Sequence, residues 1–375
     1  HTVKLSFYTN IPTPYQDDFF KALARQTDFE ACYFARTESD RSWGDRTVGF
    51  HEEYLSNGFF AKMIQRRFKD FHFSLGIFRR SLKEDADFII LGGNYFALNN
   101  FFAAMILKSR GKRLGFFSER IGQSKGLKGL VKKIYLNLFL HMIDVLILIG
   151  QTARQSYSRL GFTDINSVIV PYSIDPSPYQ NAVMDSQIRD AVRLRLNCSD
   201  KFTCLVSGAL IERKGVDLAI RTMNMLELKY PDKFCLIILG GGPLEALYRE
   251  MSGTNIHFEG FQQKDELPSY FAAADVFLFP TRYDGWGLVV NEAISAGLPI
   301  ICSANAGASE YIKEGVNGFI VHDEELTSYA TLLERLFHSD SLRSTIRQNN
   351  LLLSRAISSD AMAEQLLGAI KRLSS

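Results

Sequence analysis

Two acids between Pro280 and Gly297 have the spacing needed to bind a ligand with both hydroxyls and phosphates. Asp284 lies in a glycine-rich turn after the apolar run 276–279, and Glu292 follows eight positions later in a helical pattern. A strand, a turn and a helix start together form an anion site, because the first helical N–H groups are unpaired and partly positive. The alternative is a tight turn before an ordinary helix. A nucleotide sugar presents both kinds of group, so we expect such a ligand here.

A basic pair, Arg213 and Lys214, follows the predicted strand 202–207 and precedes a helical pattern that begins at Val216. A leaving nucleoside diphosphate gains negative charge as its glycosidic bond breaks. Basic side chains aimed at it therefore stabilise the transition state more than the ground state. The alternative is an exposed pair at a helix start, where the helix dipole disfavours cations unless an anion binds. We expect an anion-binding and catalytic role.

The segment 280–297 resembles the donor-site signature of the family-4 (group 1) retaining glycosyltransferases, which have the GT-B fold. That signature is Glu, seven residues, Glu, and this sequence has Asp284 at the first position and Glu292 at the second. The resemblance implies that Glu292 holds the ribose hydroxyls and that Asp284 contacts the donor hexose. It also implies that the amides of Gly285 to Val289 meet the diphosphate or the sugar. Asp284 is one methylene shorter than the Glu of the signature, and this difference affects which hexose is bound more than whether a hexose is bound.

The resemblance covers residues 200–322, and over the first half it rests mainly on the order of elements. Lys214 matches a basic position of the family and Arg213 is the arginine expected beside it, whereas Ala209 departs from the Arg that many members carry there.

Two more loops of the second half match the family. The glycines 240–242 correspond to a loop at the nucleotide cleft, although a tight strand–helix turn explains them equally well. The turn 256–262 corresponds to one that receives the base near Phe261. Arg213, Lys214 and Asp284 are predicted to be catalytic. The predicted donor-binding residues are Gly208, Arg213, Lys214, Gly241, Gly242, Phe261, Asp284, Gly285, Trp286, Gly287, Leu288, Val289 and Glu292.

The first half is expected to bind the acceptor. The loop 10–15 follows the first predicted strand and contains prolines, which lack an N–H donor, so we expect no phosphate contact there. Gly92-Gly93-Asn94 and Ser118-Glu119-Arg120 end two later strands at the same sheet edge. Glu119 is a candidate for the acceptor hydroxyl and for catalysis, and a surface salt bridge is the alternative. The predicted acceptor-binding residues are Pro14, Tyr15, Asn94 and Glu119.

Apolar runs alternate with amphipathic helical patterns twice along the 375 residues, which are too many for one compact core. This predicts an α/β fold of two Rossmann-like, doubly wound parallel-sheet domains facing a cleft, with a C-terminal helix that crosses back to the first domain. The predicted domains are 1–172, 173–358 and the returning helix 359–375, with a proline-rich linker at 171–178. The predicted strands are 3–8, 29–34, 87–91, 113–117, 144–149, 168–170, 202–207, 234–239, 256–259, 276–279, 300–302 and 319–321. In the second half, helices are predicted to begin near Val216, Leu244, Lys264, Leu288 and Ala308.

Charge is distributed unevenly, although the net formal charge is only +2. Residues 1–172 contain 24 Lys and Arg against 16 Asp and Glu, and residues 62–133 alone contain 16 basic against 5 acidic residues. A basic face interleaved with apolar residues attracts anionic lipids or acceptors. A solvated basic surface is an equally good interpretation. We expect salt-sensitive, peripheral association with an anionic membrane through residues 62–133.

Other chemistries find no support in the sequence. Five scattered cysteines without a Cys-x2-Cys pair indicate a reduced, cytoplasmic protein without disulfides or zinc, and no signal peptide is visible. Asp85-Ala-Asp87 precedes a strand rather than following one, as a metal site would require. The residues around Ser124 have the Gly-x-Ser-x-Gly pattern of the hydrolase nucleophile elbow, but they do not directly follow a strand as that elbow requires. We expect neither cofactor nor metal, and no nucleic acid partner.

We therefore expect a metal-independent, retaining hexosyltransferase that uses a nucleoside-diphosphate sugar, with UDP as the nucleotide. The acceptor would be a glycan or lipid-linked hydroxyl in cell-surface polysaccharide assembly, and the enzyme would act at the inner face of the plasma membrane. The resemblance implies front-face attack. A GT-B phosphorylase, a nucleotide-sugar epimerase and a non-catalytic nucleotide-sugar-binding subunit remain alternatives.

Overall fold

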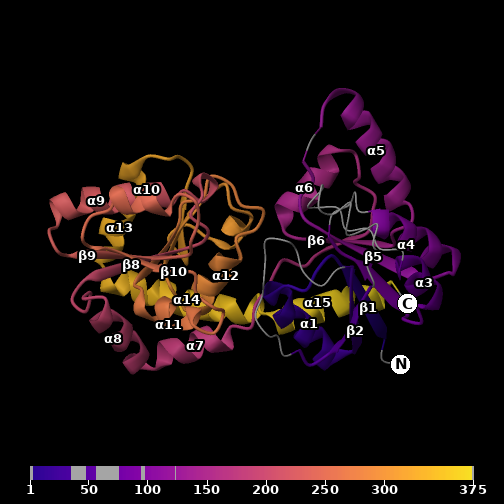
Figure 1. Ribbon diagram of the computed structural model, residues 1–375, viewed down its shortest axis with the longest axis horizontal. Coiled ribbons are helices and arrows are strands. Elements are labelled where there is room, and N and C mark those ends of the chain that lie inside the picture. Colours follow the sequence, from indigo (N-terminus) through magenta and orange to yellow (C-terminus); the bar gives the residue numbers. More distant parts are fainter. Residues whose placement is uncertain (1–2, 35–47, 56–75, 94–97, 123, 374–375) are drawn as a thin grey trace. The chain divides into compact units, whose positions relative to one another are not determined.

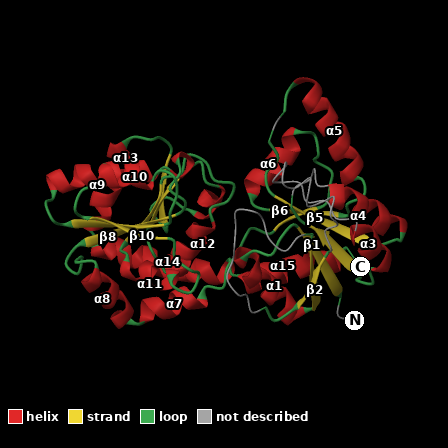
Figure 2. Ribbon diagram, in the orientation of Figure 1, coloured by secondary structure: helices red, strands yellow, loops and turns green. Residues whose placement is uncertain are grey.

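The computed structural model describes residues 3–34, 48–55, 76–93, 98–122 and 124–373. It divides into two compact units, one of residues 1–173 with 359–375 and the other of residues 174–358 (Figure 1). The chain passes between them at Ser173 and Ile174, within the proline-rich stretch. In each unit, Figure 2 shows helices on both sides of the strands.

The first unit is built on a seven-stranded sheet of order β3-β2-β1-β4-β5-β6-β7 whose described ladders are all parallel. Its strands are β1 (Lys4–Thr9), β2 (Asp28–Tyr33), β3 (His51–Tyr54), β4 (Phe88–Leu91), β5 (Arg113–Ser118), β6 (Val145–Leu148) and β7 (Ser167–Ile169). Its helices are α1 (Pro14–Gln26), α3 (Gly76–Lys83), α4 (Leu98–Ser109), α5 (Gly126–Leu140), α6 (Gln151–Arg159) and α15 (Ser359–Arg372).

Short apolar runs form the central strands, since a parallel sheet covered on both faces buries every side chain. All four residues of β4 and all four of β6 are buried. The high phenylalanine content fills this core, and among the largest fully buried side chains are Phe7, Phe20, Phe34, Phe88, Phe116 and Phe139.

The C-terminal helix α15 belongs to the first unit, as predicted. It packs against α1, where Arg25 forms an ion pair of 2.6 Å with Asp360. Gln365 also donates to the carbonyl of Ile169 at the end of β7. The helix returns because its apolar face, which includes Met362 and Leu366, is buried there.

The second unit has a six-stranded sheet of order β10-β9-β8-β11-β12-β13, with parallel ladders throughout its described strands. The strands are β8 (Phe202–Ser207), β9 (Phe234–Leu239), β10 (Ile256–Gly260), β11 (Val276–Phe279), β12 (Ile300–Ser303) and β13 (Gly318–Val321). The helices are α7 (Ser177–Met184), α8 (Ser186–Arg195), α9 (Val216–Lys229), α10 (Glu245–Glu250), α11 (Leu267–Ala273), α12 (Leu288–Ser295), α13 (Leu326–Phe337) and α14 (Asp340–Ala356), with the 3₁₀ helices η1 (Glu212–Lys214) and η2 (Gly307–Tyr311).

The predicted strands are confirmed to within two residues at each end, and the predicted helix starts at Val216 and Leu288 are correct. The helix predicted near Ala308 is instead the short 3₁₀ helix η2, and the one predicted near Lys264 begins at Leu267. No helix of the described residues is both long and apolar enough to cross a bilayer.

Candidate functional site

The predicted basic pair and the first predicted acid converge where the strand order of the second sheet reverses. From β8 the chain continues to β9 on one side and later returns through β11 on the other. Loops that leave the carboxyl ends of two such strands diverge and leave a crevice, which is where open α/β sheets bind ligands. Arg213 and Lys214 follow β8 in η1, and Asp284 follows β11. The structure therefore brings these three residues into one site.

The site combines two cations with one acid. The Nζ atom of Lys214 lies 2.5 Å from Oδ2 of Asp284, and one guanidinium nitrogen of Arg213 lies 3.9 Å from the same oxygen. Arg213 also donates to the carbonyl of Tyr283 at 2.7 Å. Lys214 and Asp284 are largely buried, whereas Arg213 is more exposed. Two positive charges against one negative charge leave an excess that favours a second anion.

A clamp made by Arg282 holds the two loops together. Its guanidinium forms two hydrogen bonds with the carboxylate of Asp217, at 2.8 and 2.9 Å, and a third with the carbonyl of Glu212 at 2.7 Å. Its backbone N–H donates to the carbonyl of Arg213 at 2.9 Å. The hydrogen bonds to Asp217 raise the pKa of Arg282. Arg282 thus positions η1, which contains both predicted basic residues, although it was absent from the predicted site.

Two glycines allow these loops to approach the end of β11. Gly215 has a φ of +65°, and a Cβ atom there would lie 2.0 Å from the carbonyl oxygen of Pro280. Gly287 has a φ of +94°, and its Cβ would lie 2.5 Å from the ring of Phe279. Only glycine satisfies both the backbone angle and the space. These residues fix where η1 ends and where α12 begins.

Glu292 lies just over one turn into α12, as predicted, but its carboxylate is turned towards the interior of the unit. It is 5% exposed, and its Oε1 accepts a hydrogen bond of 2.8 Å from the hydroxyl of Tyr179 on α7. The Tyr179 ring in turn packs edge-on against Phe271. No sequence signal links Tyr179 to Glu292, because the two residues are 113 positions apart.

The turn before α12 is stabilised internally by Trp286. The indole is buried, and its Nε1 donates to Oδ1 of Asn291 at 3.0 Å. The amide of Trp286 donates to Asp284 at 3.3 Å, and its carbonyl accepts from Ala308 at 2.7 Å. The structure therefore gives Trp286 a structural role. Gly285, Leu288 and Val289 are half-buried in the same turn and in the first helical turn.

The glycine loop after β9 packs against the loop after β8. A Cβ atom on Gly242 would lie 2.6 Å from the carbonyl oxygen of Leu210, so close packing of the two loops explains this glycine. Gly241 has more space and accepts from the amide of Leu210 at 3.0 Å. Gly208 donates to the carbonyl of Leu239 at 2.9 Å. Phe261 follows β10 at the end of the same sheet, and its ring is largely exposed.

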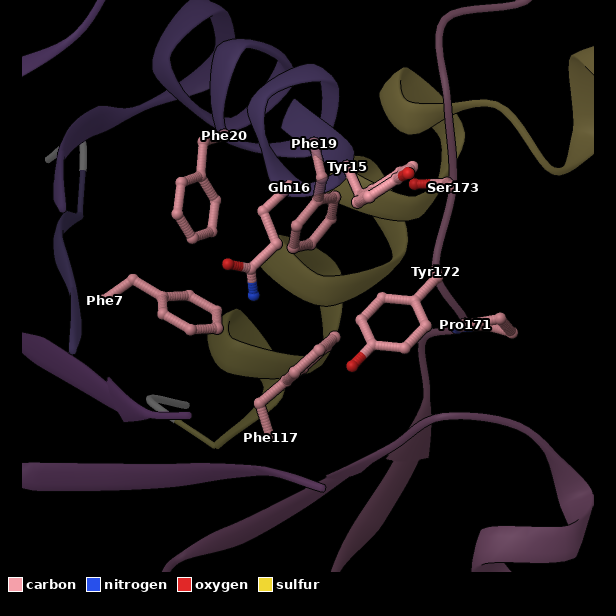
Figure 3. Close-up of a pocket in the computed structure, with 9 residues that line it drawn as sticks. All are labelled: Phe7, Tyr15, Gln16, Phe19, Phe20, Phe117, Pro171, Tyr172 and Ser173. Atoms are coloured by element: carbon pink, nitrogen blue, oxygen red, sulfur yellow. The ribbon is translucent and has the colours of Figure 1, made fainter. Parts of the chain in front are cut away.

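Three of the four predicted acceptor residues lie at or next to an aromatic pocket of the first unit. Pro14 begins α1, and Tyr15 lines the pocket rim (Figure 3). The cavity volume is about 10 Å³, enough for one water molecule but not for a sugar. Figure 3 shows Gln16 pointing among the rings. The lining residues are Phe7, Tyr15, Gln16, Phe19, Phe20, Phe117, Pro171, Tyr172 and Ser173.

Glu119 lies at the carboxyl end of β5 and is exposed. Its Oε1 accepts a hydrogen bond of 2.7 Å from the hydroxyl of Tyr172, which links it to the aromatic pocket. Burial and the neighbouring Glu119 carboxylate raise the pKa of Tyr172 well above its ordinary value, so this hydroxyl keeps its proton. Asn94, the fourth predicted acceptor residue, lies outside the described residues.

Three acids of the first unit, Glu30, Glu84 and Asp85, have carboxylate oxygens within 4.8 Å of one another. Protein cations already meet these charges, because Arg80 pairs with Glu30 and with Glu84, and Lys4 lies 2.7 Å from Asp85. We therefore assign no metal to this cluster.

Comparison with known families identifies the second unit. Residues 191–351 match the family model described as glycosyl transferases group 1. The matched range contains every predicted donor-site residue.

Two curated relatives are similar to this group 1 segment and its surroundings. The GDP-mannose-dependent alpha-(1-6)-phosphatidylinositol monomannoside mannosyltransferase of Mycolicibacterium smegmatis is 32% identical over 159 residues, which cover 39% of this chain and 41% of the relative. The D-inositol 3-phosphate glycosyltransferase of Xylanimonas cellulosilytica is 25% identical over 236 residues, with 60% and 56% covered. The chain thus spans about half the length of the curated relatives it matches.

Solved structures extend the likeness over the whole chain. The crystal structure of Anabaena Alr3699/HepE in complex with UDP aligns with a TM-score of 0.77 at 14% identity, and covers 98% of this chain and 100% of that one. At this identity the likeness concerns the fold alone. Together with the two parallel sheets and the returning α15, it confirms the predicted GT-B fold.

Proposed function

We propose that this group 1 chain transfers a hexose from a nucleoside-diphosphate sugar to a hydroxyl acceptor. The observation that carries the proposal is the convergence of Arg213, Lys214 and Asp284 at the point where the second sheet reverses its strand order. The site has two cations for a diphosphate and an acid for a sugar hydroxyl. We propose UDP as the nucleotide, in keeping with the UDP complex of the structural neighbour.

The donor would be held through three kinds of contact. The diphosphate would compete with Asp284 for Lys214, because a phosphate oxygen is as strong an acceptor as a carboxylate. Asp284, released from Lys214, would accept a hydrogen bond from the hexose. The ribose would require access to the carboxylate of Glu292, which is now hydrogen-bonded to Tyr179. We therefore expect a local rearrangement on binding. The ribose hydroxyls would donate to the Glu292 carboxylate, either in place of the Tyr179 hydroxyl or beside it.

The proposed reaction is retaining and proceeds on one face of the sugar. The bond between the anomeric carbon and the phosphate oxygen breaks, and the acceptor oxygen forms a new bond to the same carbon. The acceptor proton moves to the departing phosphate oxygen. Arg213 and Lys214 would stabilise the charge that develops on this phosphate, which lowers the barrier because the interaction strengthens in the transition state.

The acceptor is proposed to be a glycan or lipid-linked hydroxyl, with Glu119 and Tyr15 on the acceptor side and the site of action at the inner face of the plasma membrane. Two observations support this assignment. Glu119 and the start of α1 lie at the carboxyl ends of β5 and β1, the sheet edge at which such folds bind ligands. One of the curated relatives is named for a phosphatidylinositol mannoside acceptor.

Incubation of the purified chain with a panel of nucleotide sugars, in a chelating buffer and then with magnesium, tests the proposal. We expect one UDP-sugar to raise the melting temperature, and to be hydrolysed slowly or transferred, without added metal. Dependence of turnover on orthophosphate would instead indicate a phosphorylase, and isomerised donor without an acceptor an epimerase. Binding without any turnover would indicate a non-catalytic subunit. The absence of stabilisation by every nucleotide sugar would contradict the proposal.

A further inference from the structure

Helix α5 (Gly126–Leu140) of the first unit is apolar on two opposite faces. One face packs inward through Leu136, Phe139 and Leu140. The opposite face also consists of aliphatic residues, and their side chains are between 53% and 76% exposed. The exposed residues, named here the α5 stripe, are Leu127, Leu130, Val131, Ile134 and Leu138.

The α5 stripe is continuous along the helix. Four of its members follow one another at intervals of three or four positions, and Leu130 is adjacent to Val131. At 3.6 residues per turn this spacing places all five on one side. That side lies about half a turn away from Leu136 and Phe139. Figure 1 shows α5 at the margin of its unit. Isolated exposed leucines are common on protein surfaces, but five on one helical face form a contiguous patch of the kind that marks a binding surface.

The charged side chains of the segment that contains α5 are all positive. Between Arg120 and Ile143 the sequence contains five basic residues and no Asp or Glu. Lys125, Lys128 and Lys133 are exposed. The fourth lysine, Lys132, is buried and donates to the carbonyl of Gly122, so it anchors the start of the helix instead.

The basic residues of 62–133 that lie outside α5 are only partly described by the structure. Residues 62–75 lie outside the described residues. Several of the others are engaged inside the fold with carboxylates or backbone carbonyls. These are Arg80, Lys108, Arg110, Lys112 and Arg113. Among the described residues of this range, exposed basic side chains remain at Arg79 and Lys83 on α3 and in the group on and next to α5.

We propose that the α5 stripe is the surface by which this chain docks on an anionic lipid bilayer. The helix would lie in the plane of the interface, with its five aliphatic side chains among the acyl chains and its exposed lysines at the phosphate groups. This arrangement matches the amphipathic helices that bind membrane surfaces. This inference adds a membrane-docking surface to the proposed function. It rests on that function only for the choice of a lipid as the partner.

Vesicle flotation tests this inference with the purified full-length chain. Wild-type protein should float with vesicles of phosphatidylcholine and phosphatidylglycerol, less at high salt, and hardly at all with phosphatidylcholine alone. The Leu130→Gln/Ile134→Gln variant should bind the anionic vesicles at least about tenfold more weakly, since two aliphatic side chains no longer enter the acyl region. Lys128→Glu/Lys133→Glu should abolish the preference for anionic lipid.

The matched control is Leu228→Gln/Leu352→Gln, which removes two leucines that are 87% and 67% exposed on the second unit. This variant should float as wild type does. Equal flotation of the stripe variant and wild type would overturn the proposal. So would a wild-type dimer that dissociates in the stripe variant, since the stripe would then be a contact between two copies. Stabilisation by UDP, measured in parallel, reports on the donor site separately, so failure of one proposal is distinguishable from failure of the other.

Discussion

The ammonium group of Lys214 and the carboxylate of Asp284 are 2.5 Å apart, although the residues lie 70 positions apart and follow different strands. Each end of this pair has a separate proposed task, the lysine on the diphosphate and the acid on the hexose. A donor would therefore open this pair, so that the lysine can meet the phosphate and the acid the hexose.

Replacing Lys214 by alanine should lower kcat by on the order of a hundredfold, because a donor aimed at developing charge is lost. The KM for the donor should change much less, and Arg213→Ala should show the same split to a smaller extent. Steady-state kinetics with the best nucleotide sugar measures both constants. Lys229→Ala is the control, since Lys229 lies at the other end of α9 and pairs with Glu334. A Lys214→Ala variant with wild-type kcat would remove the proposed role.

Arg282 should act on turnover only through the position of η1. Arg282→Lys keeps the charge but cannot form both hydrogen bonds to Asp217, so kcat/KM should fall about tenfold. Asp217→Asn should have a similar effect, and the double variant should be little worse than either single variant, because all three break the same contact. Additive losses in this cycle, at unchanged melting temperature, would show that Arg282 and Asp217 act separately.

Variants of Glu292 and Tyr179 should affect different quantities, UDP affinity for the first residue and the free energy of unfolding for the second. Tyr179→Phe removes a hydrogen bond to the buried carboxylate of Glu292 and should cost about 2 kcal/mol of unfolding free energy while leaving UDP affinity nearly intact. Glu292→Gln should weaken UDP at least about tenfold, because the ribose hydroxyls lose a charged acceptor. Calorimetric titration and thermal melting together measure the two effects. If Glu292→Gln altered stability alone, the ribose assignment would be wrong.

Asp275 should make the second unit sensitive to acid. Burial tends to raise the pKa of its carboxyl, but Arg193 and Arg189, which lie 2.6 and 2.8 Å away, hold it below the ordinary value. A depressed folded pKa stabilises the fold above the unfolded pKa of about 3.9, and this contribution is lost as the pH falls through the folded pKa.

The Asp275→Asn variant should therefore lose about 3 kcal/mol of unfolding free energy at neutral pH, since Arg193 is left buried without its partner. The difference from wild type should shrink as the pH falls below about 4. Denaturant unfolding at several pH values measures this. The exposed Asp232, which pairs with Lys201, provides the control variant Asp232→Asn. A difference that stayed constant down to acid pH would contradict this account of Asp275.

The sequence predicts well those features that depend on local pattern. Continuous apolar runs such as β4 and β6 need no partner to be recognised, and the Asp-Gly-Trp-Gly turn fixes the start of α12 at Leu288. The short edge strand β3 has the sequence His-Glu-Glu-Tyr, which lacks such a run, and it was not predicted. Its place depends on pairing with β2 rather than on its own residues.

Contacts between residues that are distant along the chain could not be predicted from the sequence. Nothing near Arg282 indicates that it binds Asp217, and nothing near Glu292 indicates Tyr179. The exposed face of α5 was also not predicted, because a helix with apolar residues on both faces has the same composition as one buried in a core. Only the position of the helix in its unit distinguishes the two.

A crystal structure of the chain soaked with UDP tests the central claim most directly. We predict that the diphosphate lies against Arg213 and Lys214, with the Lys214–Asp284 pair opened, and that the ribose hydroxyls reach the carboxylate of Glu292. If the nucleotide bound elsewhere, or if Glu292 stayed on Tyr179 while the ribose contacted other groups, the proposed donor site would be contradicted.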